Sequence, residues 1–276
     1  MFERNSITPS WLKPGMLPTR SLVSMGVAAC LAIGLTSANA DEADAKRILK
    51  SMSDYMSEQK SFSFNYDSIL EVVTPEGQVI GLASSGSLTF SRPDKIRATR
   101  SGGFVDVATN FDGKTLTILG KNLNKFTQVE IPGTVDHLID ELKNTYNRPL
   151  PAADLLLSNS YDELMQGVLD VKDLGSGVIG GVECDSLAFQ TEEVDWQIWI
   201  AQGDQPYPCR YVITTKELTN GPQYSVQISN WQTGLDVAAD DFTFKNTTEA
   251  EQVELESLKG MGDLPDHFVV TKGESQ

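Results

Sequence analysis

The sequence has few of the residues from which catalytic and metal sites are usually built. It contains 2 histidines and 3 cysteines in 276 residues. A metal site needs several converging ligands, and a serine or cysteine nucleophile needs a base beside it. His137 starts an expected helix and His267 lies in the C-terminal tail, and neither has such neighbours in the sequence. We therefore expect no catalytic residue, no metal and no cofactor.

Glycine-rich phosphate loops and paired catalytic carboxylates are absent as well. The stretch 113–115 reads Gly-Lys-Thr, but a strand rather than a helix is expected to follow it. The adjacent carboxylates Asp140-Glu141 and Asp162-Glu163 point apart, whereas acid–base pairs face each other across a cleft about 5–10 Å wide. These absences argue against an enzyme.

Positive charge is scarce. The chain has 22 Lys and Arg against 38 Asp and Glu, a net charge of −16. This balance argues against nucleic acid and against anionic lipid headgroups as partners, because both would be repelled. It favours solubility and, weakly, basic partner surfaces.

No apolar run is long enough to span a membrane comfortably. The longest, 22–35, follows the basic residues Lys13 and Arg20 and precedes Ala38-Asn39-Ala40, a small-x-small cleavage site. This arrangement predicts a cleaved secretory signal peptide over residues 1–40, with Met16 and Met25 left open as initiators. An alternative is lipidation at Cys30, although residues 31–35 remain apolar where a lipoprotein usually turns polar.

Two cysteines, Cys184 and Cys209, remain after cleavage, and export makes a disulfide between them the expected state. In a simple meander a third strand would separate them by roughly 9–10 Å. A bridge needs Cα atoms within about 7 Å. The disulfide is therefore feasible only if the middle strand stops near Ile200, or if Pro206 and Pro208 bulge the chain inward.

The pattern of apolar residues predicts one mainly β (α+β) domain, residues 41–245, followed by an acidic C-terminal tail, 246–276. Four runs with short connections predict an antiparallel meander at 181–189, 194–200, 209–216 and 223–231. Further strands are expected at 61–73, 79–90, 95–100, 104–111, 114–119, 125–131 and 167–174. Helical periodicity marks 41–60, 135–146, 152–157 and 161–165, with Thr134 as an N-cap.

Three stretches together resemble the LolA/LolB-like superfamily of periplasmic lipoprotein carriers. They are a helix that follows the signal peptide and leads into a strand, Arg92-Pro93 followed by D-G-K-T-L at 112–116, and Asp-x-Phe-x-Phe at 240–244. The meander with D-W-Q-I-W-I looks more specifically like a family of predicted periplasmic proteins of unknown function in that superfamily. The resemblance covers about residues 42–245.

The resemblance implies a curved antiparallel half-open barrel covered by helices, located in the periplasm. In the carriers the concave face takes acyl chains, and the Arg before the Pro, here Arg92, helps to hold the helical lid. The chain departs from the carriers at Pro149-Leu150-Pro151 and at Lys245-Asn246, so the resemblance does not imply carriage of lipoproteins as such.

The leading hypothesis is a monomeric, non-catalytic binding protein that shelters a lipid or another apolar ligand, with lipid or lipoprotein handling as a candidate role. Its alternative is an envelope interaction module that docks a protein partner and has a packed interior. The residues expected to line the ligand site are Phe90, Leu138, Leu142, Trp196 and Ile198.

Overall fold

The computed structural model describes residues 37–146, 150–218, 220–234 and 241–254. The signal-peptide prediction therefore falls largely outside the described residues. The helices are α1 (Ser37–Glu58), α2 (Val135–Asn144), the 3-10 helix η1 (Ala153–Leu156) and α3 (Ser160–Leu164). The strands are β1 (Ser61–Val73), β2 (Val79–Ser91), β3 (Lys95–Gly102), β4 (Asp106–Phe111), β5 (Thr115–Gly120), β6 (Lys125–Glu130), β7 (Asp170–Ile179), β8 (Val182–Gln190), β9 (Val194–Ala201), β10 (Pro208–Thr215), β11 (Gln223–Thr233) and β12 (Glu251–Gln252).

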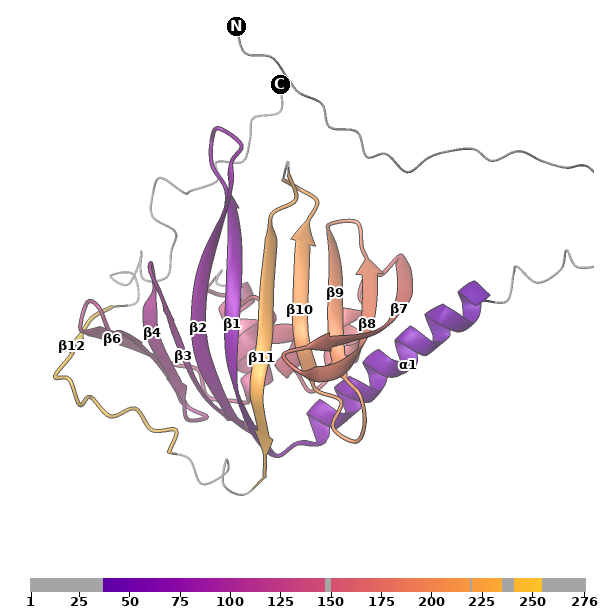
Figure 1. Ribbon diagram of the computed structural model, residues 1–276. Helices are drawn as coiled ribbons and strands as arrows, with labels where there is room; N and C mark the ends of the chain where they lie inside the picture. Colours follow the sequence, from indigo (N-terminus) through magenta and orange to yellow (C-terminus); the bar gives the residue numbers. More distant parts are fainter. Residues whose placement is uncertain (1–36, 147–149, 219, 235–240, 255–276) are drawn as a thin grey trace, which may run out of the picture. The chain divides into compact units, whose positions relative to one another are not determined.

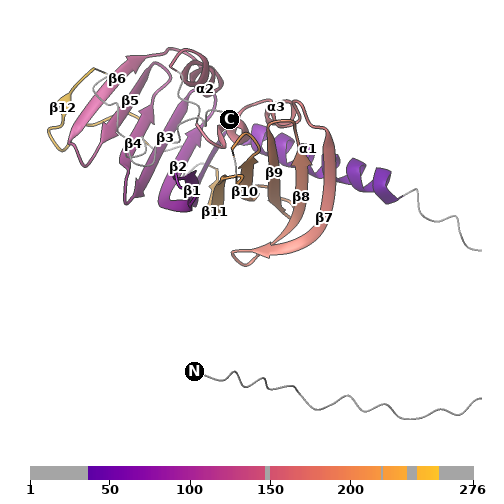
Figure 2. The ribbon, with the colours of Figure 1, turned by 90° about the horizontal axis from the view of Figure 1, so that it is seen from above.

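In the part of the chain that the structure describes, all twelve strands form one open sheet. Its order is β12-β6-β5-β4-β3-β2-β1-β11-β10-β9-β8-β7, and every pair is antiparallel except β12 with β6. Figure 2 shows that the sheet is strongly curved and that the helices lie on its concave side. This arrangement confirms the mainly β fold class with an open, curved sheet.

The two halves of the chain meet where β1 pairs with β11, in the middle of the sheet (Figure 1). The register runs from Phe62 opposite Thr233 to Leu70 opposite Tyr224. On its other side β1 pairs with β2 along its full length, from Ser61 opposite Ser91 to Val73 opposite Val79. Side chains of β1 at alternate positions therefore face the concave side next to both halves.

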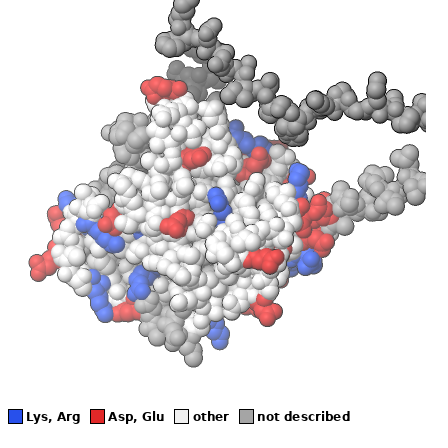
Figure 3. Space-filling model, in the orientation of Figure 1, with Lys and Arg blue, Asp and Glu red and all other residues white. Residues whose placement is uncertain are grey.

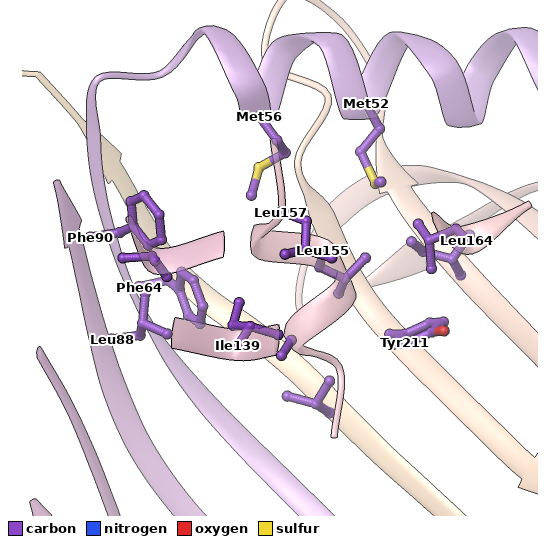
Figure 4. Packing of buried hydrophobic residues seen from close by; sticks show 14 of the residues in the cluster. Met52, Met56, Phe64, Leu88, Phe90, Ile139, Leu155, Leu157, Leu164 and Tyr211 are labelled. Carbon is purple, nitrogen blue, oxygen red and sulfur yellow. The ribbon is translucent and has the colours of Figure 1, made fainter. Parts of the chain in front are cut away.

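The concave face and the helices form the main hydrophobic core (Figure 4). Helix α1 contributes residues at helical spacing, all at most 1% exposed: Ala45, Leu49, Met52 and Met56. Helix α2 starts at Thr134, whose side chain accepts a hydrogen bond from the His137 backbone N–H, as the N-cap prediction required. Its four buried residues are Val135, Leu138, Ile139 and Leu142. The amphipathic stripes seen in the sequence thus bury themselves against the sheet.

Trp231 at the end of β11 anchors this core. Its ring stacks on Phe62 and on Tyr207, with centroids 5.0 and 5.1 Å apart, and its indole N–H donates to the Tyr55 hydroxyl at 3.2 Å. These contacts join α1, both central strands and the β9–β10 connection.

The segment after residue 240 crosses the opposite face of the sheet. Arg97 of β3 donates to the Asp241 carbonyl at 3.1 Å, and Phe244 packs on Phe126 of β6 at 5.0 Å between ring centroids. Phe242 between them is 5% exposed. Residues 241–244 therefore cross this face without forming a strand, and the chain then pairs with β6 through β12.

Gly86 in β2 permits a close crossing of Tyr66. A β-carbon at Gly86 would lie 2.0 Å from the Thr99 carbonyl oxygen and 2.6 Å from Tyr66 Cζ. We expect Gly86→Ala to lower the free energy of unfolding by about 2 kcal/mol or more, because the clash involves backbone. Gly103→Ala is the matched control, since no atom lies within 4 Å of a β-carbon there. Urea unfolding would measure both, and equal stability of the two variants would contradict this packing.

Candidate apolar ligand site

All five residues expected to line a ligand site lie in the main core. Phe90 of β2 and Ile198 of β9 are fully buried, and Leu138, Leu142 and Trp196 are 3–8% exposed. The structure thus brings together residues from the two halves of the sheet and from α2. Their side chains are in contact with the covering helices, so a ligand would have to displace part of this cover.

The centre of the site is aromatic. Trp196 stacks on Phe189 with ring centroids 3.8 Å apart and meets Tyr211 edge-on at 5.7 Å. Burial raises the pKa of Tyr211, and the neighbouring carboxyl of Asp154 raises it further. Burial also raises the pKa of Asp154, which belongs to η1. The sequence analysis did not single out Tyr211 or Asp154, because nothing in the pattern showed that η1 lies over β10.

Arg92, expected to be a latch, links the rim of the sheet to the helices. Its Nη2 donates to the Met56 carbonyl at 3.3 Å and to the Leu156 carbonyl at 3.1 Å. Its guanidinium lies 4.9 Å from the centroid of the Phe90 ring. Burial lowers the pKa of Arg92, and Nε is buried without a partner among the described residues. One cation therefore joins the ends of β2 and α1 to η1.

Further polar contacts hold residues 150–165, which we call the lid segment. The hydroxyls of Ser53 in α1 and Ser160 in α3 share a buried hydrogen bond of 2.7 Å, and Ser53 Oγ also accepts from the Tyr161 N–H at 2.9 Å. The Asp136 carboxylate of α2 accepts hydrogen bonds from Ser158. The lid segment is thus tied to α1, α2 and β2 by side-chain hydrogen bonds rather than by sheet pairing.

The disulfide is not confirmed, because Cys184 and Cys209 are free thiols in the structure. Both are buried in one small cluster. Cys184 is opposite Ala201, the last residue of β9, and a register shift between Pro208 and Arg210 places Cys209 in a bulge. Burial raises the pKa of both thiols, and each thiol also influences the pKa of the other. The middle strand thus ends beside the pair.

Other features of the described residues lie away from this site. No helix among them is long and apolar enough to cross a bilayer, and no group of three or more His, Cys, Asp or Glu could hold a metal ion. A hollow of about 650 Å³ lies between the end of α2 and the β6–β12 edge. It is lined by Thr127, Gln128, Val129, Glu130, Tyr146, Gln252, Val253 and Glu254, none of which was expected to bind a ligand.

Comparison with known proteins gives one family match. The family model described as "Predicted periplasmic protein (DUF2092)" matches residues 45–256. No curated protein matches the sequence significantly.

Several solved structures resemble the fold at low sequence identity. An uncharacterized conserved protein from Thermus thermophilus is 9% identical at a TM-score of 0.43, over 76% of this chain and 98% of that one. The lipoprotein LppX from Mycobacterium tuberculosis is 13% identical at 0.42, over 71% and 99%. A LolA superfamily protein from Nitrosomonas europaea is 13% identical at 0.32, over 72% and 97%. Each TM-score lies below 0.5, so these structures carry no argument about the ligand or the partners of this chain.

The hydrogen bond from Arg92 to Leu156 should slow local opening of the lid segment. We expect Arg92→Ala to speed amide exchange in residues 153–157, because η1 loses its bond to the sheet rim, worth about 1.5–3 kcal/mol for a charged donor. Arg47→Ala is the control, since Arg47 pairs with Asp44 on the exposed side of α1. Hydrogen exchange read by mass spectrometry would test this. Unchanged exchange in residues 153–157 would show that Arg92 does not hold the lid.

Proposed function

The chain belongs to the DUF2092 family of predicted periplasmic proteins, as its motifs predicted, and from this premise we propose that it is a non-catalytic binding protein. It shelters a lipid or another apolar ligand between its curved sheet and its helices. The observation that carries this proposal is that the lid segment makes apolar contacts beneath it and polar contacts at its rim. Beneath it the sheet is apolar, and at its rim it is held closed by hydrogen bonds that Arg92 donates, Asp136 accepts and Ser53 shares with Ser160.

The energetics allow such a lid to open for an acyl chain. Lifting the lid segment exposes the side chains that it buries, chiefly Leu155, Leu157 and Leu164. Burying an acyl chain stabilises the complex by about 0.8 kcal/mol per methylene. A chain of a dozen methylenes can therefore replace the apolar contacts of the lid, and the hydrogen bonds at the rim set the barrier to opening.

Export fits this role. Cleavage after Ala40 would fall in the first turn of α1, which begins at Ser37, and would leave Asp41, Glu42 and Asp44 at the new helix N-terminus. Carboxylates there are favoured by the helix dipole. We infer a soluble periplasmic monomer released by signal peptidase, with a lipid anchor at Cys30 as the less favoured form.

A staple across the lid tests the proposal. Ser53→Cys with Ser160→Cys, in a chain with Cys184→Ala and Cys209→Ala, places two thiols where the native hydroxyls lie 2.7 Å apart. The reduced protein should take up N-phenyl-1-naphthylamine and release it to palmitate, and the oxidised protein should take it up at least about tenfold more slowly, because the lid segment must move to admit a ligand.

The single variant Ser53→Cys is the control, since oxidation leaves its lid free. Native mass spectrometry of the wild-type protein from periplasm adds an independent reading, with a bound apolar molecule expected. A reduced protein that binds no probe, together with a clean apo mass in every preparation, would refute the proposal.

The second candidate is an envelope interaction module with a packed interior. It is favoured by the close packing of the core and by the face of the sheet opposite to the helices, which carries few charged side chains over β1, β2 and β11 (Figure 3). This candidate predicts that the reduced and the oxidised staple variants take up the probe equally little, and that no preparation contains a bound lipid.

We also propose that Cys184 and Cys209 are joined in the exported protein. Forming the S–S bond removes one proton from each thiol and two electrons in total, and the thiol oxidant of the periplasm accepts the electrons. The raised thiol pKa leaves little thiolate in the folded chain, so the bond should form before the cluster is buried. Protein from the periplasm should show no free thiol after denaturation, whereas residues 41–276 made in the cytoplasm should show two. Two free thiols in periplasmic protein would rule the bond out.

A further inference from the structure

Arg100 is a cation on the concave face that has no carboxylate partner among the described residues. It is opposite Gly86 of β2, and Gly86 is opposite Tyr66 of β1, so these three positions share one face of the sheet. Tyr66 packs against the main core, which identifies this face as the one that the helices cover. Figure 1 shows that β1 and β2 continue past the helices toward their hairpin.

Neighbouring hydroxyls fix the guanidinium of Arg100. Its Nε donates to Ser84 Oγ at 3.0 Å, and Ser84 shares a hydrogen bond of 2.9 Å with Ser68. Both serines are at most 4% exposed, so this end of the guanidinium is held in a buried polar row. The other end stacks over the Phe104 ring, 5.4 Å from its centroid. The two terminal nitrogens, Nη1 and Nη2, have no partner among the described residues.

Two tyrosines complete the surroundings of Arg100. Burial raises the pKa of Tyr66 to about 12 and also raises the pKa of Tyr224, so both phenols stay neutral at physiological pH. The positive charge of Arg100 lowers the pKa of each phenol. The Tyr66 hydroxyl donates to the Thr99 carbonyl at 2.9 Å, which keeps its ring beside Arg100.

The described arginines differ in their partners. Arg47 pairs with Asp44, and Arg92 donates to two backbone carbonyls. Asp154 is the carboxyl that η1 places over the concave face, and Arg100 is not among the groups that shift its pKa. A guanidinium with two free nitrogens binds carboxylate or phosphate through paired hydrogen bonds.

We propose that Arg100, supported by Ser84 and Ser68, binds the anionic head of an amphiphile whose chain lies under the helices. This inference rests on the proposed function and narrows its ligand to a molecule with one oxyanion head and one apolar chain. The net charge of −16 opposes docking on an anionic bilayer but acts weakly on a single anion, because salt screens charges beyond about 8 Å.

The test compares heads on one chain length. Palmitate, hexadecyl phosphate and 1-hexadecanol would each displace N-phenyl-1-naphthylamine from the wild-type protein, from Arg100→Gln and from the control Arg47→Gln, which also removes one positive charge. The wild type and the control should bind at least one of the two anions about tenfold or more tighter than the alcohol, because a charge-assisted pair discriminates more than a neutral one. Which anion binds more tightly identifies the head. Arg100→Gln should lose this preference and keep its affinity for the alcohol.

The outcomes separate the two proposals. Alcohol binding with no preference for either anion in the wild type, or a preference that survives in Arg100→Gln, would overturn the role of Arg100 and leave the apolar site standing. Failure of all three compounds in the wild type would remove both. If Arg100→Gln does not fold, as judged by circular dichroism, Arg100→Lys should fold and show a reduced preference, and a full preference there would count against paired hydrogen bonds from the guanidinium.

Discussion

The pairing of β1 with β11 is the contact on which the rest of the structure depends. Without it, the antiparallel runs β1–β6 and β7–β11 would be two separate sheets. The pairing joins residues about 160 positions apart, so its loop-closure entropy must be offset by packing at the seam. Trp231, Phe62 and Tyr207 supply that packing where the strands meet α1. The covered concave face extends across this seam, because residues of both halves lie in one core cluster.

The concave face of the sheet is covered by a segment that does not belong to the sheet. Phe90 and Ile198 are inaccessible to solvent in the described structure, yet the lid segment above them makes no strand pairing with the sheet. A segment held by side-chain hydrogen bonds opens at lower cost than one held in a backbone ladder. Under the proposed function, the lid segment is therefore the part of the cover that opens. Under the proposed function, the polar contacts at the rim would govern opening of the lid segment, and the apolar contacts beneath it would govern retention of the ligand.

Local pattern predicted most of the elements, because each reflects neighbours in the sequence. The strand 61–73 and the Thr134 cap match the structure, and the other strand limits differ by a few residues. The tail was less predictable: residues 251–252 pair with β6 only after Phe242 and Phe244 have crossed the far face. Arg100 escaped notice for a similar reason, since its face is set by register with Gly86 and Tyr66 on other strands. The register between distant strands determines which face of the sheet such residues occupy, and this register cannot be read from the pattern of a single sequence.

Both edges of the sheet are protected, although by different means. On one side β12 adds a two-residue parallel strand to β6, and Lys125 pairs with Glu251 there. On the other side α1 packs against β7, which is interrupted by an irregularity between Asp173 and Ser176. Unpaired strand edges are templates for growth into fibrils, and short terminal strands, charges and bulges block that growth. These features oppose edge-to-edge growth of a sheet whose two ends do not meet.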